Sequence, residues 1–230
     1  MTDRPDTDRT PASNHPARDE PDVGAAVIQH TAPSSDHYTI HQEPFMRSIT
    51  ASFFISVDGV VDAPQQWHFP YANDDVMRVV SHATEDVDAL LMGRRTFEEW
   101  KAFWPEQRGY PLADFINSTH KYVASDTLTD LGWGPSSALS GDVVAHVAAL
   151  KRSEGGTIAI NGSGTLTRHL LQAGLVDALH LLVHPLVVGT GKHLFEAGTA
   201  PVGLSLESQE YFDNGVNYQV YRPAAVDDAA

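Results

Sequence analysis

The sequence predicts an α/β fold in which helices cover both faces of a mixed, mostly parallel sheet. From residue 47 onward, short β-branched segments alternate with segments of helical periodicity, the order expected of a layered α/β domain. Two apolar segments run directly into glycine turns that open helices, as the strands of parallel sheets do. Near the end, Asp213-Asn214-Gly215 joins two strand-like segments into a hairpin, and this antiparallel pair makes the sheet mixed.

Composition divides the chain near residue 45. Residues 1–45 contain six of the fourteen prolines and eight acidic against three basic side chains, with no apolar periodicity. Such a segment buries too little apolar surface to offset the entropy cost of ordering, so we expect a disordered leader. The patterned domain occupies residues 46–223, and residues 224–230 form a short acidic tail that we also expect to be disordered.

The first half of the domain predicts three strands and two helices. Residues 49–57 are apolar and β-branched and end at the turn signal Asp58-Gly59. Asn73 and Asp74 can cap a helix, because their short polar side chains accept hydrogen bonds from its first backbone N–H groups. The remaining predicted elements are a strand at 89–92, a helix opened by Gly93 and a strand at 121–124.

The second half adds two helices, a short buried strand and a long strand before the closing hairpin. Asp142 can cap a helix that ends at Gly155-Gly156. Residues 157–160 form a buried strand, and the segment after it has apolar residues at helical spacing. Residues 179–188 indicate one long strand with Pro185 at an edge or a bulge. The predicted hairpin strands are 204–211 and 216–221.

Charge and residue usage exclude several classes of protein. The 30 acidic and 15 basic side chains give a net charge of −15, which argues against nucleic acid or an anionic membrane as partner. No apolar run suits a transmembrane helix and the acidic start does not match a signal peptide, so we expect a cytoplasmic protein. We expect no metal either, because the chain has no cysteine and because His180 and His184 lie about 13 Å apart along one strand.

The segment Asn161-Gly162-Ser163-Gly164-Thr165 follows the strand at 157–160 and opens a helix. Its glycines let the backbone approach a ligand closely, and the first N–H groups of the helix lack backbone partners. Both features attract a phosphate group to this end of the helix. The alternative is a tight strand–helix turn that binds no ligand.

A second junction of this kind is Gly93-Arg94-Arg95-Thr96. Two arginines at a helix N-terminus oppose the helix dipole, and a bound anion would relieve that conflict. The alternative is that both arginines pair with surface carboxylates. Two such junctions predict a dinucleotide across the carboxyl edge of the sheet, although the Rossmann fingerprint is incomplete. The segment Gly189-Thr190-Gly191-Lys192-His193 lacks the P-loop pattern and is interpreted as a turn after a strand.

In order and spacing, the motifs resemble the dihydrofolate reductase-like superfamily. The most similar branch is the stand-alone relatives of the C-terminal domain of the bacterial bifunctional deaminase–reductase of riboflavin biosynthesis. The resemblance covers about residues 46–222 and implies a three-layer sandwich with a C-terminal antiparallel hairpin, and a homodimer. Its motifs are Ile55-Ser56-Val57-Asp58-Gly59, Trp67-His68-Phe69-Pro70, Gly93-Arg94-Arg95-Thr96, Val123-Ala124-Ser125, Asn161-Gly162-Ser163-Gly164 and Gly189-Thr190-Gly191.

The resemblance implies a site for NADPH. Cofactor phosphate would be held by Gly93, Arg94, Arg95 and Thr96, and the pyrophosphate by Asn161, Gly162, Ser163, Gly164 and Thr165. Ser125 would lie near the adenosine ribose and its 2′-phosphate. Asp126 follows that serine where similar sequences often have a basic residue. Because a carboxylate repels a phosphate, NADH stays open as the cofactor.

The resemblance also implies a substrate cleft beside the nicotinamide. Asp58, at the end of the first strand, is the candidate for orienting the substrate or relaying a proton. Trp67 and Phe69 would form a wall of the cleft, and plain core packing is the alternative for both rings. Residues 60–71, a mixture of glycine, proline and aromatic residues, are the candidate lid.

Two departures from the family pattern leave the substrate open. Folate reductases carry a carboxylate where this chain has Ala72, and Asp74 is a nearby acidic candidate. The stretch that grips the sugar phosphate in riboflavin-pathway reductases is missing, and Arg108 is the candidate anion holder in its place.

Together these features predict an NAD(P)H-dependent reductase that transfers hydride to a C=N or C=O carbon of a small heterocyclic substrate. Its activity would resemble that of 5-amino-6-(5-phosphoribosylamino)uracil reductase or dihydrofolate reductase. The alternative is a nucleotide-binding sensor or scaffold on the same fold that has lost turnover.

Overall fold

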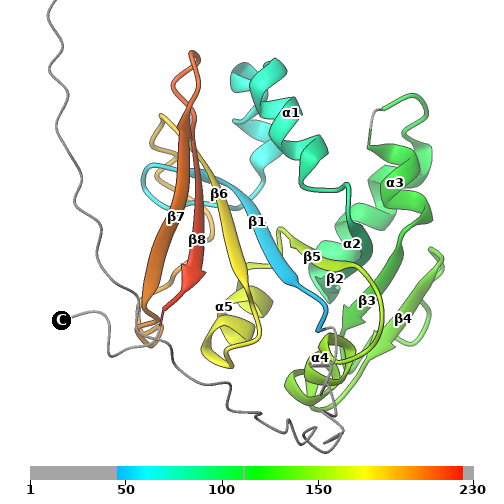
Figure 1. Ribbon diagram of the computed structural model, residues 1–230. Coiled ribbons are helices and arrows are strands. Elements are labelled where there is room, and N and C mark those ends of the chain that lie inside the picture. Colours follow the sequence, from blue (N-terminus) through cyan, green and yellow to red (C-terminus); the bar gives the residue numbers. More distant parts are fainter. Residues whose placement is uncertain (1–45, 111, 225–230) are drawn as a thin grey trace, which may run out of the picture. The chain divides into compact units, whose positions relative to one another are not determined.

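The computed structural model describes residues 46–110 and 112–224, which build one mixed sheet and the helices around it (Figure 1). The strands are β1 (Ile49–Ser56), β2 (Val87–Gly93), β3 (His120–Ala124), β4 (Ser136–Leu139), β5 (Thr157–Asn161), β6 (Ala178–His184), β7 (Leu204–Tyr211) and β8 (Asn217–Pro223). The α-helices are α1 (Asp74–His82), α2 (Arg94–Phe103), α3 (Ala113–Ser118), α4 (Val143–Lys151) and α5 (Gly164–Gln172). Short 3₁₀ turns are η1 (Pro64–Gln66), η2 (Phe69–Tyr71) and η3 (Trp104–Glu106).

The eight strands have the order β4-β3-β2-β5-β1-β6-β8-β7. The first six of these run parallel, and β8 and β7 complete the sheet as an antiparallel hairpin. Strand β1 lies at the centre, where Ile49 pairs with Ile158 of β5 and Thr50 pairs with Ala178 of β6. The predicted mixed, mostly parallel sheet with a C-terminal hairpin is therefore confirmed.

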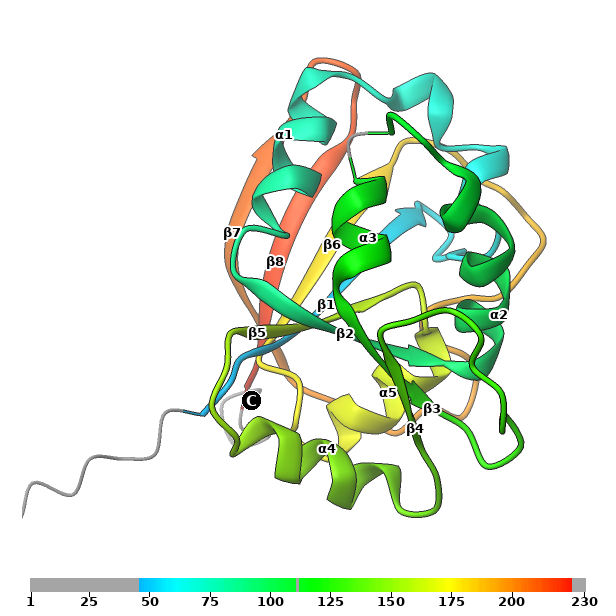
Figure 2. The same cartoon turned by 90° about the vertical axis from the view of Figure 1, so that its right-hand side faces the viewer.

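Helices cover both faces of this sheet (Figure 2). Successive strand residues point to opposite faces, so Leu90 packs with Phe97 of α2 and Ile116 of α3, whereas Leu91 packs with Val147 of α4. Helix α5 joins α4 on that second face, and α1 lies on the first face beside β6 and β8. The three layers of the predicted sandwich are thus α1–α3, the sheet, and α4–α5.

Polar side chains cap two of the helices as the sequence predicts. The Asn73 side chain accepts a hydrogen bond from the Val76 N–H at 3.0 Å, and Asp142 accepts one from the Ala145 N–H at 3.0 Å. Asp74 is an exposed residue in the first turn of α1, where its charge suits the helix dipole. Both α1 and α4 therefore begin where their capping signals predict.

The structure differs from the sequence prediction in two places. Strand β6 ends at His184, so the predicted strand at 179–188 is wrong beyond that residue. Pro185 has no N–H for the ladder, and the Leu186 N–H instead bonds the His184 carbonyl at 2.8 Å in a tight turn. The short elements α3 and β4 were not predicted. The predicted leader, and the tail apart from residue 224, lie outside the described residues.

No helix among the described residues is both long enough and apolar enough to span a membrane.

Candidate functional site

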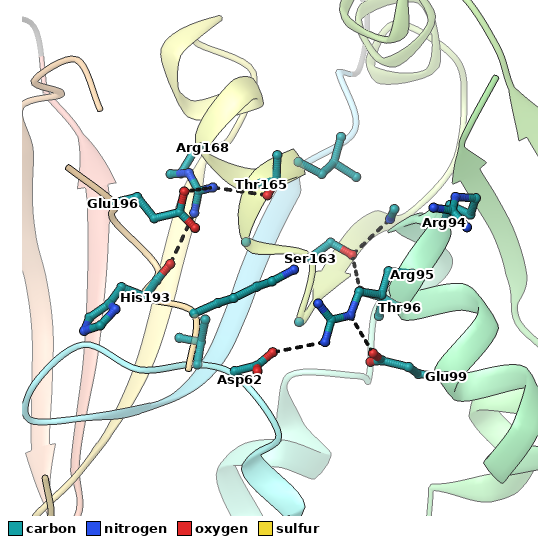
Figure 3. A pocket seen from close by; sticks show the side chains of 16 residues that line it. Asp62, Arg94, Arg95, Thr96, Glu99, Ser163, Thr165, Arg168, His193 and Glu196 are labelled. Atoms are coloured by element: carbon teal, nitrogen blue, oxygen red, sulfur yellow. Dashed lines mark hydrogen bonds and ion pairs between the residues drawn. The ribbon is translucent and has the colours of Figure 1, made fainter. Parts of the chain in front are cut away.

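Two strand–glycine–helix junctions lie side by side at the carboxyl edge of the sheet. Strands β2 and β5 are parallel neighbours, with Leu90 paired to Ala159, so α2 and α5 begin next to each other. Their first turns line one pocket of about 240 Å³ (Figure 3). This volume is below the roughly 300–1,000 Å³ of pockets for drug-sized ligands, so the pocket can enclose one part of a dinucleotide.

Ser163 joins the two junctions. Its hydroxyl accepts a hydrogen bond from the Gly93 N–H at 3.0 Å and donates one to the Thr96 hydroxyl at 2.9 Å. The side chain is buried and makes no capping bond to its own helix. Among the residues predicted to bind the cofactor, Ser163 thus positions the two turns against each other.

The backbone at both junctions is shaped to receive an anion. Neither Gly93 nor Ser163 makes a side-chain capping bond, so among the described residues the N-termini of α2 and α5 are uncapped. Gly162 has a φ of +80°, which side-chain-bearing residues rarely adopt, and a Cβ there would lie 3.8 Å from Thr96. Two adjacent helix N-termini of this kind form a phosphate-binding arrangement.

A third chain segment completes the pocket from the other side of α5. Lys192 and His193 belong to the predicted glycine turn, and they line the pocket together with Arg168 and Glu196. Backbone hydrogen bonds fix this segment: the Val61 N–H donates to the Lys192 carbonyl at 2.9 Å. None of these four residues is assigned to the cofactor site from the sequence alone.

Most cations of the pocket already have carboxylate partners, as Figure 3 shows for Arg95 and Arg168. Arg95 pairs with Glu99 at 2.8 Å and with Asp62 at 3.6 Å. The other pairs are Arg94–Glu98 at 3.1 Å and Arg168–Glu196 at 3.2 Å. Lys192 has no ion-pair partner within residues 46–110 and 112–224. The pairing of both arginines with carboxylates, one of the two alternatives above, is present in the structure.

Two predicted cofactor residues lie outside the pocket lining. Ser125 follows β3, and its hydroxyl accepts hydrogen bonds from the N–H groups of Thr127 and Leu128, which shapes the turn after that strand. Asn161 is the last residue of β5, directly before the glycine turn. Neither residue is among those that surround the pocket.

Asp58 connects the first strand to the segment that carries Lys192. Its carboxylate accepts hydrogen bonds from the Ser56 hydroxyl at 2.5 Å, the Val188 N–H at 3.1 Å and the Gly189 N–H at 2.8 Å. These donors stabilise the charged form and lower the pKa of Asp58 to about 2. A carboxyl group so engaged is ionised near neutral pH, which favours an anchoring role for Asp58.

Aromatic rings gather at the carboxyl ends of β1 and β6. Trp67 lies edge-on to His184, with ring centroids 5.3 Å apart, and its Nε1 donates to the Asp62 carbonyl at 3.0 Å. His68 stacks on Phe54, and the exposed ring of Phe69 contacts His68. We call the rings of Phe54, Trp67, His68, Tyr71 and His184 the aromatic cluster.

The other predicted substrate residues, Asp74 and Arg108, lie outside the pocket lining. Both are exposed, on α1 and after η3 respectively. His180 is half-buried and bonds the Tyr218 hydroxyl at 2.6 Å, while His184 is fully buried.

A family model, the RibD C-terminal domain, matches residues 47–218. The chain belongs to the RibD C-terminal domain family. The match covers strands β1 to β7 and the first two residues of β8, and it confirms the resemblance derived from the motifs.

Individual proteins are similar to this chain as well. The chain is 29% identical over 139 residues to the uncharacterized protein YyaP of Bacillus subtilis (strain 168), which is 59% of this chain and 73% of YyaP. A putative riboflavin biosynthesis protein from Shewanella sp. PV-4 superimposes with a TM-score of 0.65 and 20% identity, covering 77% of this chain and 99% of that one.

The RibD C-terminal domain also shares its fold with folate reductases. A dihydrofolate reductase from Enterococcus faecalis, complexed with NADP(H), has a TM-score of 0.55 and 16% identity, covering 79% of this chain and 99% of its own. The predicted dihydrofolate reductase-like sandwich is therefore confirmed.

Within this RibD C-terminal domain, the sequence around Arg168 and Lys192 indicates a helix and a turn, but it does not by itself assign either residue to the pocket. Arg168 lies three residues after Thr165, one helical turn along, and its Nη2 contacts the Thr165 hydroxyl at 3.1 Å. Lys192 belongs to the glycine turn that the sequence identifies. What the sequence does not specify is that this turn folds back against residues 59–61 and so reaches the pocket.

Proposed function

We propose that this protein is an NAD(P)H-dependent reductase that acts on a small heterocyclic substrate. The observation that carries the proposal is the pocket at the edge of β2 and β5, where two uncapped helix N-termini and Lys192 face the same space. Membership of the RibD C-terminal domain family and the fold shared with a reductase complexed with NADP(H) support it.

The residues of the pocket fit the phosphates of such a cofactor. The backbone of Gly162 and Gly164 would approach the pyrophosphate closely, since glycine has no side chain to block it. A Cβ at Gly164 would lie within 4 Å of Val61, Leu194 and Arg168 and would narrow the pocket. Lys192 and the N–H groups of Arg95 and Thr96 would supply the positive charge and the donors. The bound cofactor supplies a hydride. The protein binds the cofactor and the substrate, orients them toward each other and excludes water from the site.

NADPH is the cofactor we propose, with NADH as the other outcome of the test. The carboxylate of Asp126 would repel the 2′-phosphate of NADPH if it pointed toward it. It instead accepts a hydrogen bond from the Gly141 N–H at 2.6 Å and so points to the β4–α4 turn. Arg94 and Arg95 are exposed, and their carboxylate partners are surface residues that a phosphate can displace.

The test is a titration of NADPH and of NADH, separately, against the tryptophan fluorescence of the full chain. We expect saturable binding of NADPH with energy transfer from tryptophan to the nicotinamide, and weaker binding for Lys192→Gln. The matched control is Lys101→Gln, on the half-exposed lysine of α2, which should bind NADPH as the wild type does. Failure of both nucleotides to bind at millimolar concentration would overturn the proposal.

A second candidate function is a nucleotide-binding sensor or scaffold without turnover. The observation that favours it is the state of Asp58, whose carboxylate accepts hydrogen bonds from three donors that stabilise its charged form. Tight NADPH binding combined with no oxidation of NADPH by pterins, pyrimidines or carbonyl compounds would support this candidate over the reductase.

Partner and assembly remain proposals. We propose a small-molecule substrate, no nucleic-acid or membrane partner, a cytoplasmic location and a homodimer. Light scattering of the full chain checks the last of these, and a mass of one protomer at micromolar concentration would contradict it.

A further inference from the structure

A second pocket lies between α5 and the segment that leads into β7. Its volume is about 360 Å³, larger than the 240 Å³ of the pocket at the edge of β2 and β5, which we call the cofactor pocket. This volume falls within the roughly 300–1,000 Å³ of pockets for drug-sized ligands. The walls of the second pocket are mostly apolar and include Leu171 of α5, Phe195, Val202 and Leu204 of β7.

The two pockets share one ion pair. Arg168 and Glu196 line both of them, and no other residue that lines the second pocket is ionisable. The Arg168 side chain is only 12% exposed, whereas that of Glu196 is 51% exposed. The carboxylate of Glu196 is therefore the charged group that a ligand in the second pocket can reach most easily.

Other hydrogen bonds hold Arg168 in place without Glu196. Its Nη1 donates to the carbonyls of Leu194 at 2.8 Å and His193 at 3.2 Å. Its Nη2 donates to the Thr165 hydroxyl at 3.1 Å (Figure 3). The Nη2 lies 3.2 Å from the Glu196 carboxylate, longer than the roughly 2.7–2.9 Å of a tight charge-assisted hydrogen bond. Because such a pair with an exposed partner contributes little, Glu196 can exchange Arg168 for another cation.

The charges at this shared wall favour a cationic ligand. An anion on Arg168 would place a second negative charge beside the Glu196 carboxylate, in a chain whose net charge is already −15. A cation on Glu196 has the opposite effect, because it replaces Arg168 when a cofactor phosphate attracts that arginine. The apolar walls of the pocket further require an apolar body attached to the charged group.

We infer that the second pocket is an effector site for an apolar amine, whose ammonium group pairs with Glu196 and whose hydrocarbon body packs between α5 and the segment before β7. The amine takes Glu196 from Arg168, and the uncompensated arginine then attracts the cofactor phosphates. Because linkage is reciprocal, the amine and the cofactor raise each other's affinity by the same factor. This coupling rests on the proposed function, whereas the amine site itself does not.

The experiment uses three probes of similar shape: 2-phenylethylamine, which is a cation at pH 7, the neutral 2-phenylethanol and the anionic 3-phenylpropanoate. Binding of each probe to the full chain is measured by calorimetry. We expect the amine to bind at least about fivefold more tightly than the alcohol, and the anion to bind most weakly. Equal affinities for amine and alcohol, tighter binding of the anion, or no binding of any probe would overturn the inference.

The variant Glu196→Gln tests the assigned carboxylate. Because this side chain is exposed, the substitution should leave the fold intact, and the amine and the alcohol should then bind within about twofold of each other. The matched control is Glu207→Gln, on a half-exposed carboxylate of β7 that pairs with Arg222 and does not line the second pocket. The control should retain the preference for the amine, and loss of the preference in both variants would contradict the assignment.

The coupling is measured by titrating NADPH with and without saturating 2-phenylethylamine. We expect NADPH to bind at least about threefold more tightly to the wild type when the amine is present. NADPH should bind Glu196→Gln more tightly than the wild type, with no further effect of the amine. An amine that binds but leaves the affinity for NADPH unchanged would overturn the effector role. Nucleotide binding without probe discrimination removes the inference alone, and probe discrimination without nucleotide binding removes the proposed cofactor.

Discussion

Ser163 connects the two junctions of the pocket through one buried hydroxyl. Removal of this hydroxyl tests how much the connection contributes to stability and to NADPH binding. In Ser163→Ala the Gly93 N–H loses its acceptor in a buried position, and we expect unfolding in urea to require about 1–3 kcal/mol less free energy. NADPH binding should weaken as well, because the turns are no longer fixed against each other.

The control for this prediction is Ser153→Ala. Ser153 is exposed and donates to the Leu150 carbonyl at 2.7 Å, so its loss should change the free energy of unfolding by less than about 0.5 kcal/mol. A loss of stability in Ser163→Ala no larger than in the control would show that the hydroxyl bridge contributes little.

For Asp58, we predict that Asp58→Asn loosens the segment that carries Lys192. The amide offers one acceptor oxygen where the carboxylate uses two, so the Val188 or Gly189 N–H loses its partner. Hydrogen exchange at these two amides should accelerate, while Asp213→Asn, in the exposed turn of the hairpin, should leave it unchanged. A pH–rate profile that loses an ionisation between pH 5 and 9 in Asp58→Asn would instead support proton relay.

The low pKa of Asp58 also predicts how the stability of the protein changes with pH. Its folded pKa of about 2 lies below the ordinary value of about 3.9, so its stabilising contribution is present above about pH 4. That contribution is lost as the pH falls toward 2. Acid unfolding of Asp58→Asn should therefore lack the part of the pH dependence that the wild type shows in this window.

At the scale of elements, Lys121 joins β3 to the short helix α3. Its fully buried ammonium donates to the carbonyls of Thr119 at 2.7 Å and Asn117 at 3.2 Å and lies 4.4 Å from the centroid of Trp133. Burial lowers the pKa of Lys121 to about 8. Between pH 8 and about 10 the unfolded chain therefore binds more protons than the folded one, and stability rises with pH.

We predict that this rise disappears in Lys121→Met. Relative to the variant, the wild type should gain at most about 3 kcal/mol of unfolding free energy between pH 8 and 10.4, measured by urea titration at each pH. Lys101→Met serves as the control and should keep the wild-type slope. An equal slope in Lys121→Met would show that another group titrates in this range.

The sequence could predict the elements that have strong local signals, but not α3 and β4. Helices α1 and α4 carry capping residues and apolar periodicity, and both were predicted with their starts. Helix α3 has six residues, too few to show a helical period, and β4 includes Ser136 and Ser137 in place of an apolar run. Ile116 of α3 packs with Leu90, and Leu139 of β4 packs in the core cluster that contains Val147 of α4. The end of β6 at His184 depends on a turn that the apolar run does not indicate.

The candidate site could be predicted only as far as it is local. Each junction, at Gly93 and at Gly162, is a strand–helix boundary visible in a few residues. That they are neighbours follows from the family resemblance and from the pairing of β2 with β5. The approach of Lys192 and the stacking of His68 on Phe54 depend on contacts between distant segments, which no local pattern contains.

At the scale of the whole molecule, residues 46–224 contain the complete sheet and its covering helices. We predict that a chain beginning at Met46 unfolds at the same temperature as the full chain, within about 2 °C, because the family match begins at residue 47. Calorimetry of both chains checks this. A lower midpoint for the shorter chain would mean that residues 1–45 contribute to stability, against the predicted disordered leader.

The central place of β1 also determines when the protein can fold while it is being made. On the ribosome Ile49 of β1 is synthesised more than a hundred residues before Ile158 of β5, with which it pairs. Ala178 of β6, the partner of Thr50, is synthesised later still. The earliest apolar strand of the domain is therefore the one that stays without neighbours through most of translation, a period in which exposed apolar strands invite chaperones or aggregation. Because these contacts join such distant positions, closure of the sheet is a slow, late event, and a nascent chain released before residue 184 lacks the complete β6 that pairs with the other edge of β1.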